Sequence, residues 1–286
     1  MPNKQNTAVI DIGSNSIRYL GDGAKVLITT RLAQGLLATG RLGEEPIRRS
    51  LAAIEEFARL AQRQGRTPYA YATSAVRDAS NGGEFAACVE AMGVPVRILT
   101  GEEEAAFALL GAGSPPGLVD IGGGSCQLVS EGFSLSFPIG CVRARDLCDA
   151  AGAETFDAMR DAVFARCKAL FLFPRVSFRF CTGVGGTITT LAALTQGLSS
   201  YDPAAMEKAS LTLQGVEAIA RALLAQGEAR KKHPLLRERH DVIVPGALVL
   251  LYVMQGMGVE RMSVSDADGM EGYLAWLTQG GAHPAY

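Results

Sequence analysis

The chain has 286 residues, of which 48% are hydrophobic and 20% charged. That composition is typical of a globular protein with a sizeable core, and the length fits two domains. The net charge of −2 argues against a protein built to coat nucleic acid or an anionic membrane. Six scattered cysteines without a CxxC pair, no signal peptide and no bilayer-length apolar segment predict a cytoplasmic protein without zinc or dithiol chemistry.

Short apolar strands alternate with helical runs along the chain, which predicts an α/β fold. In the first half we expect strands at residues 7–11, 16–20, 24–30, 69–72 and 94–99, and helices at 44–64, 82–92 and 102–110. Residues 111–117 are rich in glycine and proline and predict the boundary between domains 1–115 and 116–268. In the second half we expect strands at 118–120, 126–129, 178–181 and 261–264, and helices at about 155–172, 186–195, 212–227 and 246–256. A final helix, at about 269–286, could pack back on the first domain.

A strand that ends in Asp-Ile-Gly and continues into a serine-containing turn occurs twice. The copies are Val9-Ile10-Asp11-Ile12-Gly13-Ser14-Asn15-Ser16 and Leu118-Val119-Asp120-Ile121-Gly122-Gly123-Gly124-Ser125. Such self-similarity predicts two related halves. Turns of this composition expose backbone N–H groups that bind phosphate, and serine and asparagine add further donors. The candidate phosphate ligands are therefore Ser14, Asn15, Ser16, Gly122, Gly123, Gly124 and Ser125, although two tight hairpin turns would use the same residues.

Asp11 and Asp120 end the two repeated strands. Carboxylates beside a phosphate site commonly hold Mg²⁺, but an Asp also accepts hydrogen bonds from its own turn. A third glycine turn, Thr182 to Thr187, is expected to lead from a strand into a helix. A helix that begins with glycines is a ready anion site, which makes Gly185 and Gly186 candidate phosphate ligands.

Three glutamates, Glu102, Glu103 and Glu104, open the helix predicted after Thr100. Thr100 and Glu103 have the spacing of a capping box, and acidic residues here suit the helix dipole. Glu104 is then free to orient a water as a general base, but sequence alone does not choose among the three. Two arginines, Arg77 and Arg143, have the planar donors that suit phosphate oxygens, whereas a solvated surface position is the ordinary alternative.

Taken together and in order, these segments resemble the Ppx/GppA phosphatase family. The matching segments are residues 11–16, 72–78, 101–105, 119–125, 138–143, 183–187, 241–247 and 264–267, which span nearly the whole chain. The resemblance implies the actin-like ATPase (sugar kinase/actin) superfold, with two ribonuclease H-like domains and an interdomain active-site cleft. It also implies exopolyphosphatase activity with Mg²⁺, or hydrolysis of guanosine pentaphosphate. A homodimer is possible, and neither nucleic acid nor a membrane is an expected partner.

Residue by residue, the resemblance makes Glu104 the general base and Arg77 a ligand of the scissile phosphate. It makes Asp120 a metal ligand, and it makes Asn15, Gly122, Gly123 and Ser125 phosphate-turn positions. The family usually has a further acidic metal ligand where this chain has Gln127. The Gln127 amide oxygen can still be a ligand of Mg²⁺ but supplies no charge, so we expect weaker or altered metal dependence. An arginine is also common near Met270. These departures leave open a catalytically weakened sensor of polyphosphate or guanosine polyphosphate, beside a kinase of the same superfold and an actin-like filament protein.

Overall fold

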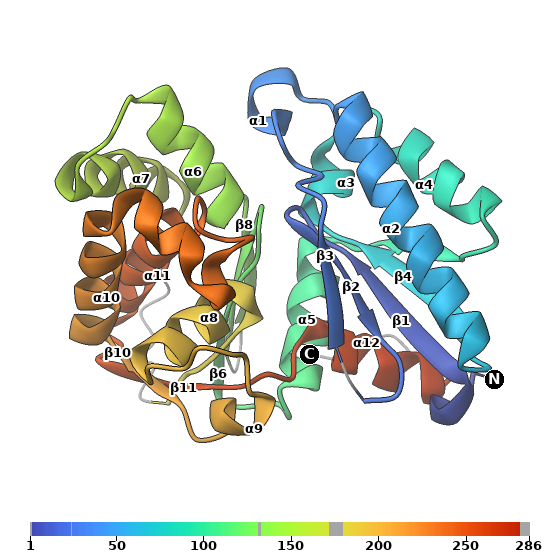
Figure 1. The fold of residues 1–286 in the computed structure, drawn as a ribbon. Helices are drawn as coiled ribbons and strands as arrows, with labels where there is room; N and C mark the ends of the chain where they lie inside the picture. The colour runs from blue at the N-terminus through green and yellow to red at the C-terminus, as the bar shows by residue number, and fades with distance from the viewer. Residues whose placement is uncertain (1, 24, 131–132, 172–179, 281–286) are drawn as a thin grey trace. The chain divides into compact units, whose positions relative to one another are not determined.

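The computed structural model describes residues 2–23, 25–130, 133–171 and 180–280. The chain divides into two compact units, of which unit 1 comprises Met1–Gly113 and Asp268–Tyr286 and unit 2 comprises Ser114–Ala267. The chain therefore leaves unit 1 after Gly113 and re-enters it at Asp268. Each unit is built around one mixed β-sheet (Figure 1).

The sheet of unit 1 has five strands in the order β3-β2-β1-β4-β5. Their bounds are Thr7–Ile12 (β1), Ser16–Leu20 (β2), Lys25–Thr29 (β3), Thr67–Ala72 (β4) and Val96–Ile98 (β5). Strands β1, β2 and β3 form an antiparallel meander, whereas β4 and β5 run parallel to β1. The carboxyl ends of β1, β4 and β5 therefore lie at one edge of the sheet.

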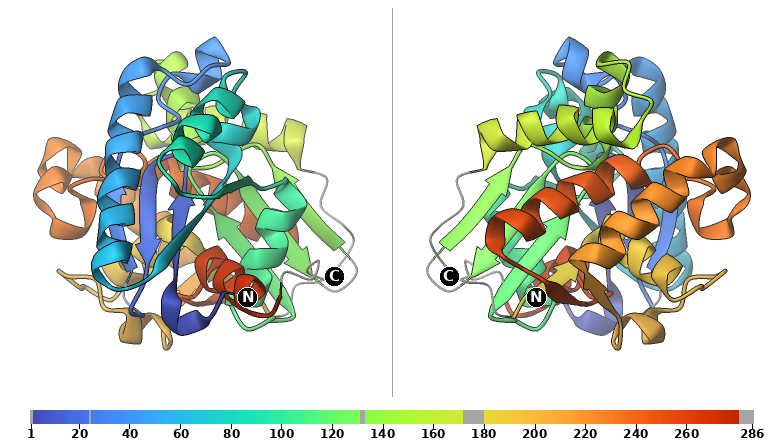
Figure 2. Two further views of the ribbon diagram at one scale, coloured as in Figure 1. Left: turned by 90° about the vertical axis from the view of Figure 1, so that its right-hand side faces the viewer. Right: turned by 90° about the vertical axis from the view of Figure 1, so that its left-hand side faces the viewer.

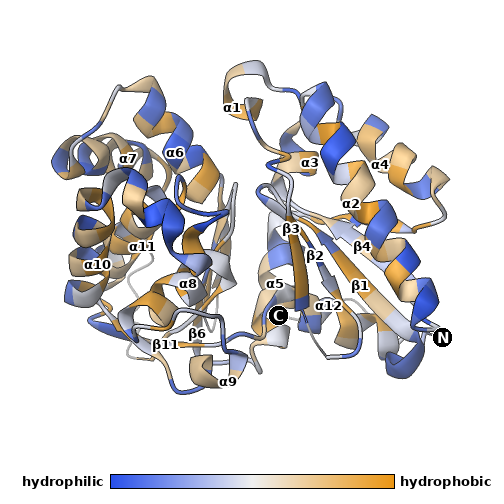
Figure 3. Ribbon diagram, viewed as in Figure 1, coloured by the Kyte–Doolittle hydropathy of each residue, from blue (hydrophilic) through white to orange (hydrophobic). Residues whose placement is uncertain are grey.

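Helices cover both faces of this sheet. Helices α2 (Glu44–Arg63) and α4 (Gly82–Ala91) pack on one face, and α5 (Gly101–Gly111) and α12 (Gly269–Thr278) pack together on the other (Figures 1 and 2). Helix α2 is amphipathic, and Figure 3 shows hydrophilic and hydrophobic segments alternating along it. Its buried Ile54, Phe57 and Ala61 recur at helical spacing and face the sheet, where Phe57 stacks on Tyr19.

The sheet of unit 2 has six strands in the order β10-β11-β9-β6-β7-β8. Their bounds are Gly117–Ile121 (β6), Cys126–Ser130 (β7), Phe133–Phe137 (β8), Thr182–Val184 (β9), Ser210–Thr212 (β10) and Arg261–Val264 (β11). An antiparallel meander, β6-β7-β8, is followed by the parallel strands β9 and β11, as in unit 1, and β10 adds an antiparallel edge. Both units thus share the strand order expected of a ribonuclease H-like domain, and the predicted α/β fold of two related domains is confirmed.

The core of unit 2 is built largely on one apolar helix, α11 (Ile243–Met257), most of whose side chains are buried. The helices packed against it are α6 (Cys141–Ala150), α7 (Phe156–Leu170), α8 (Gly185–Thr195) and α10 (Leu213–Ala225). Short helices complete the chain: α1 (Leu36–Thr39), α3 (Ser74–Asp78), α9 (Pro203–Met206) and 3₁₀ turns at Lys4–Asn6, Gly227–Lys232 and Pro234–Leu236. Among the described helices, none combines the length and apolarity needed to cross a membrane.

Several element bounds differ from those expected. Strand β8 and helices α3 and α6 were not predicted, and α11 begins before Pro245 because the first turn of a helix tolerates proline. Helix α8 begins at Gly185. Residues 178–179 of the strand predicted at 178–181 lie outside the described residues, and the described strand, β9, begins only at Thr182. Helix α12 ends at Thr278 and packs on α5 and β1 of unit 1.

Candidate functional site

In unit 1, predicted site residues gather where the parallel strands end. The Thr73 N–H donates to the Ile12 carbonyl at 3.2 Å, and the Leu99 N–H donates to the Ala72 carbonyl at 2.9 Å. These bonds continue the pairing of β1, β4 and β5 into the segments that follow them, residues 13–16, 73–77 and 99–104. In open α/β sheets, ligands bind outside such carboxyl ends.

Arg77 and Glu104 contact each other at this edge. Nη1 of Arg77 lies 3.0 Å from Oε2 of Glu104 and donates a second hydrogen bond to the Leu99 carbonyl at 2.9 Å. The side chains are 23% and 12% exposed, so both are largely but not fully withdrawn from solvent. The structure thereby brings together the two residues predicted to be catalytic.

Glu103 has a different, local role. Its Oε2 accepts the Thr100 N–H at 2.9 Å while the Thr100 hydroxyl accepts the Glu103 N–H, which completes the capping box of α5. Its other oxygen pairs with Arg97. Burial alone would raise the pKa of Glu103, but the hydrogen bonds from Thr100 and Arg97 hold that pKa below its ordinary value. The cap therefore accounts for Glu103, and Glu104 is the glutamate that Arg77 contacts.

The first phosphate turn, residues 13–16, is fixed by its neighbours. Ser14, Asn15 and Ser16 are buried, and the Ser14 hydroxyl lies 3.0 Å from that of Ser74 at the start of α3. The Asn15 carbonyl accepts N–H groups from residues 30 and 31 at 3.1 and 2.8 Å. A Cβ at Gly13 would stand 2.9 Å from the Ser16 carbonyl oxygen, so the turn requires glycine there. Its conformation is set before any ligand binds.

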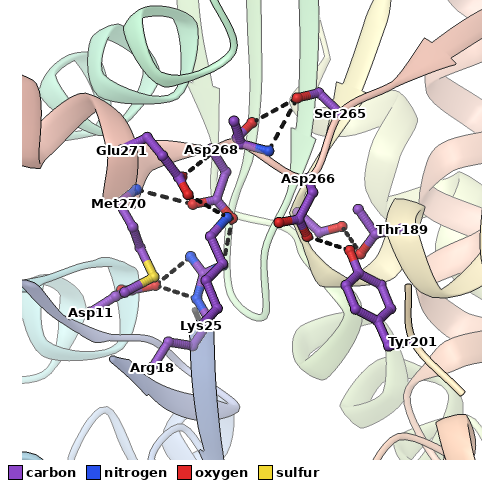
Figure 4. Close-up of polar contacts among 12 residues, drawn as sticks. Asp11, Arg18, Lys25, Thr189, Tyr201, Ser265, Asp266, Asp268, Met270 and Glu271 are labelled. Carbon is purple, nitrogen blue, oxygen red and sulfur yellow. Dashed lines mark hydrogen bonds and ion pairs between the residues drawn. The ribbon is translucent and has the colours of Figure 1, made fainter. Parts of the chain in front are cut away.

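Asp11 was predicted as a metal ligand, and the structure pairs it with Arg18, which sequence reasoning missed. Oδ2 of Asp11 lies 2.7 Å from Nε and 2.5 Å from Nη2 of Arg18 (Figure 4). Oδ1 is buried and has no hydrogen-bond partner among the described residues. Burial raises the pKa of Asp11 despite the opposing effect of Arg18. One oxygen of this carboxylate is therefore committed to an ion pair, and the other remains an unmatched acceptor.

The second phosphate turn, residues 122–125 in unit 2, repeats the geometry of the first turn, residues 13–16 in unit 1. The Gly122 N–H donates to the Ser125 carbonyl at 3.0 Å, as the Gly13 N–H does to the Ser16 carbonyl at 3.1 Å. The carbonyls of Gly122 and Gly123 accept the first two N–H groups of α6 at 3.0 and 2.8 Å. Arg143 lies in the first turn of the same helix and donates to the Pro138 carbonyl at 3.2 Å. The turn is thus docked on the helix that contains Arg143.

Asp120 and Gln127 stand directly opposite each other on the antiparallel strands β6 and β7. Gln127 is fully buried, and its Nε2 donates to the Ser136 hydroxyl at 3.1 Å. Its Oε1 is buried without a partner among the described residues. Gly185, with φ +85°, brings its backbone so close that an added Cβ would overlap Oδ1 of Asp120. The start of α8 therefore contacts Asp120, whose partner position on the neighbouring strand is Gln127.

Arg239 is a second residue that sequence reasoning missed. A Cβ added at Gly186 would stand 2.5 Å from both Nη atoms of Arg239, so the guanidinium lies on the backbone of Gly186. Burial raises the pKa of the nearby Cys141 thiol, while Arg239 and a hydrogen bond with Thr187 oppose that rise. In sequence Arg239 is one of several basic residues between 230 and 239, and no motif separates it from them.

A metal ion bound beside Asp120 and Gln127 would have few protein ligands. Within the described ranges, no three His, Cys, Asp or Glu residues gather in a way that could hold one. Mg²⁺ needs only one or two protein ligands because it keeps most of its waters. A buried acceptor without a donor is what a cation or its bound water satisfies, so Asp120 and the unmatched Oε1 of Gln127 fit Mg²⁺.

Comparisons with known proteins find one family and several relatives that match nearly the whole chain. The Ppx/GppA phosphatase family matches residues 2–278. Exopolyphosphatase 2 of Mycobacterium tuberculosis is 31% identical, over 93% of this chain and 96% of its own. The guanosine-5'-triphosphate,3'-diphosphate pyrophosphatase of Vibrio cholerae is 28% identical over 95% of this chain, which spans only 59% of that protein. The crystal structure of an exopolyphosphatase-like protein superposes with a TM-score of 0.84 at 26% identity, covering 96% of this chain and 98% of that one.

Proposed function

The chain belongs to the Ppx/GppA phosphatase family, and we propose that it is an exopolyphosphatase that hydrolyses the terminal phosphoanhydride bond of inorganic polyphosphate. The observation that carries the proposal is the contact between Arg77 and Glu104 beside the first phosphate turn. Similarity over nearly the full length of the Mycobacterium tuberculosis enzyme supports the same activity.

Glu104 is the proposed general base. It would accept a proton from the water that attacks the terminal phosphorus, while Arg77, from its other donors, would neutralise the phosphate oxygens. The ion pair holds the carboxylate in one orientation before substrate arrives. Positioning and charge stabilisation account for most of the catalysis in phosphoryl transfer, and both depend on such prior order.

The phosphate turn of unit 1, the phosphate turn of unit 2 and the helix starts of unit 2 would each bind phosphate. Backbone N–H groups of residues 14–16 and 123–125 supply donors without adding net charge. Arg239, on the backbone of Gly186, adds a cation at the start of α8, where the helix dipole also favours an anion. A chain with a net charge of −2 can in this way hold a polyanion locally.

Asp120 and Gln127 would hold the Mg²⁺ that this chemistry needs. When bound, Mg²⁺ supplies positive charge to the phosphate oxygens. Because Gln127 contributes an amide oxygen in place of a carboxylate, the site has less negative charge with which to retain the ion.

The test is phosphate release from tripolyphosphate and from guanosine pentaphosphate, with and without Mg²⁺, by the wild-type chain and Glu104→Ala. We expect release from tripolyphosphate that requires both Mg²⁺ and Glu104. Faster release from guanosine pentaphosphate would instead favour the second candidate, the activity named for the Vibrio cholerae relative. No release from either substrate, with binding retained, would support a weakened sensor, for which the neutral, buried Gln127 is the structural argument.

A further inference from the structure

Five charged side chains form a cluster in unit 1, which we call the re-entry cluster (Figure 4). Its members are Asp11 on β1, Arg18 on β2, Lys25 on β3, and Asp268 and Glu271 at the start of α12. Arg18 and Asp268 are 250 positions apart in sequence. The cluster joins the strand that leads into the first phosphate turn to the point at which the chain re-enters unit 1.

Asp268 is the N-cap residue of α12. Its Oδ1 accepts the Met270 N–H at 3.0 Å, and its own N–H donates to Glu271 Oε2 at 2.8 Å, which completes a capping box. Lys25 Nζ lies 3.1 Å from Glu271 and 3.6 Å from Asp268. Asp268 is 3% exposed and is the first residue of unit 1 after the chain leaves unit 2.

Arg18 connects this helix start to β1. Its Nη1 lies 2.5 Å from Asp268 Oδ2, while Nε and Nη2 contact Asp11 Oδ2 at 2.7 and 2.5 Å. In the described part of the chain, Arg18 supplies the only hydrogen bonds to the Asp11 carboxylate, whereas Asp268 also has its cap and Lys25. Loss of Arg18 would thus leave the buried Asp11 carboxylate without a hydrogen bond and with only the charge of Lys25 to oppose its own, and such a group reorients or neutralises.

Asp11 stands two residues before Gly13, where the first phosphate turn begins. The Ile12 carbonyl between them accepts the Thr73 N–H that leads into α3. A shift of the Asp11 side chain would therefore be transmitted to the backbone that presents the N–H groups of residues 14–16.

We propose that Arg18 is a positioning residue for phosphate binding: its bridge from Asp11 to Asp268 fixes the end of β1, and with it the first phosphate turn, to the residue at which the chain re-enters unit 1. The effect on phosphate binding rests on the proposed function. The effect on the backbone of residues 12–16 does not, and it can be measured separately.

The experiment compares Arg18→Met, Asp268→Asn and the double variant with the wild-type chain. We expect Arg18→Met to raise KM for tripolyphosphate about tenfold with little change in kcat, because the turn is misplaced rather than the general base lost. Asp268→Asn should have a smaller effect, and the double variant should be no worse than Arg18→Met. Arg18→Lys, which restores the charge, should recover part of the loss.

Arg48→Met is the matched control, since Arg48 pairs with Glu45 on the exposed surface of α2 and its side chain is 73% exposed. It should leave KM unchanged. A lower kcat at constant KM in Arg18→Met would indicate only a smaller folded fraction and would overturn the proposal.

Amide hydrogen exchange provides the second readout and needs no activity. Arg18→Met and the milder Asp268→Asn should exchange faster than wild type at residues 12–16, and Arg48→Met should not. Faster exchange confined to residues 268–278 would show that Arg18 only stabilises α12, and the proposal would fail. If the wild-type chain releases no phosphate, the proposed function fails, and the exchange at residues 12–16 still decides the role of Arg18.

Discussion

Nη1 of Arg77 lies 3.0 Å from Oε2 of Glu104, although 27 positions separate the two residues in sequence. The contact arises because β4 and β5 are parallel neighbours, so the segments that follow them emerge at the same edge of the sheet. Arg77 also donates to the Leu99 carbonyl, which fixes the guanidinium on the backbone just before α5 begins. The orientation of the Glu104 carboxylate is therefore set by the sheet as well as by its own helix.

Replacement of Glu104 tests the general base. Glu104→Gln should lower kcat for tripolyphosphate at least a hundredfold, because the amide cannot accept the proton of the attacking water. The thermal unfolding midpoint should change little, since the amide oxygen can still accept from Arg77. Phosphate release and thermal unfolding are measured on the same preparations. Glu102→Gln, in the same helical turn, is the control, and equal losses in both variants would refute the assignment.

Replacement of Arg239 tests the cation found on Gly186. Arg239→Met should raise KM for tripolyphosphate about tenfold, because a charged hydrogen-bond donor is removed from the proposed phosphate site. Arg237→Met removes an exposed arginine two residues away and should leave KM unchanged. Steady-state kinetics at fixed Mg²⁺ give both values. An unchanged KM in Arg239→Met would leave Arg239 with a purely structural role.

A carboxylate at position 127 tests the proposed metal site. Gln127→Glu should lower the Mg²⁺ concentration needed for half-maximal activity, because it adds a negative charge opposite Asp120. Without Mg²⁺ the variant should unfold at a lower temperature, since the charge is buried, and added Mg²⁺ should restore stability. Gln62→Glu makes the same charge change on the exposed side of α2. If both variants respond alike to Mg²⁺, the ion does not bind at Gln127.

Because Gly185 lies so close to Asp120, adding one methyl group at Gly185 should affect both stability and the response to Mg²⁺. Gly185→Ala should destabilise the protein by about 1–2 kcal/mol, because an L-residue is strained at φ +85°. It should also weaken the response to Mg²⁺, because the methyl group displaces Oδ1 of Asp120. Denaturant unfolding and Mg²⁺ titration of activity measure the two effects. Gly83→Ala, in α4 with open space around its Cβ, should instead be neutral or slightly stabilising.

The lowered pKa of Asp268 predicts how the free energy of unfolding depends on pH. Burial alone would raise the pKa of Asp268, but Arg18 and Lys25 lower it from 3.8 to about 2. The folded state therefore binds this proton less readily than the unfolded state, so the contribution is present above about pH 4 and is lost as the pH falls toward 2. The wild-type chain should be more stable than Asp268→Asn by about 2 kcal/mol above that window from this effect.

The stabilities of the wild-type chain and Asp268→Asn must be compared with each other at each pH. Burial raises the pKa values of Asp11 and Glu271, and a raised carboxyl pKa contributes stability in the opposite direction, toward acid. Urea unfolding of wild type and Asp268→Asn between pH 2 and 5 measures how the stability contribution of the Asp268 carboxylate changes with pH. A stability difference that stays constant over this window would contradict the low pKa.

The sequence alone predicted the fold class and most of the elements, because short apolar strands and amphipathic helices are local patterns. It also identified both Asp-Ile-Gly turns, since glycine and serine are the residues that such turns require. Two elements with a recognisable local pattern were nevertheless missed. Helix α6 buries Cys141, Ala144 and Cys148 at helical spacing although it is rich in charged residues, and the edge strand β8 alternates apolar and polar residues.

Only the tertiary structure decided which side chains meet. Sequence named Arg77 and Glu104 separately, but the parallel pairing of β4 and β5 brings them into contact. It offered Asp11 as a metal ligand, whereas burial beside Arg18 commits one of its oxygens to an ion pair. Neither Arg18 nor Arg239 belongs to a motif, and their partners are fixed by chain segments far away in sequence. Turn chemistry depends on a few adjacent residues, but the pairing of charges depends on strand order and on the return of α12 to unit 1.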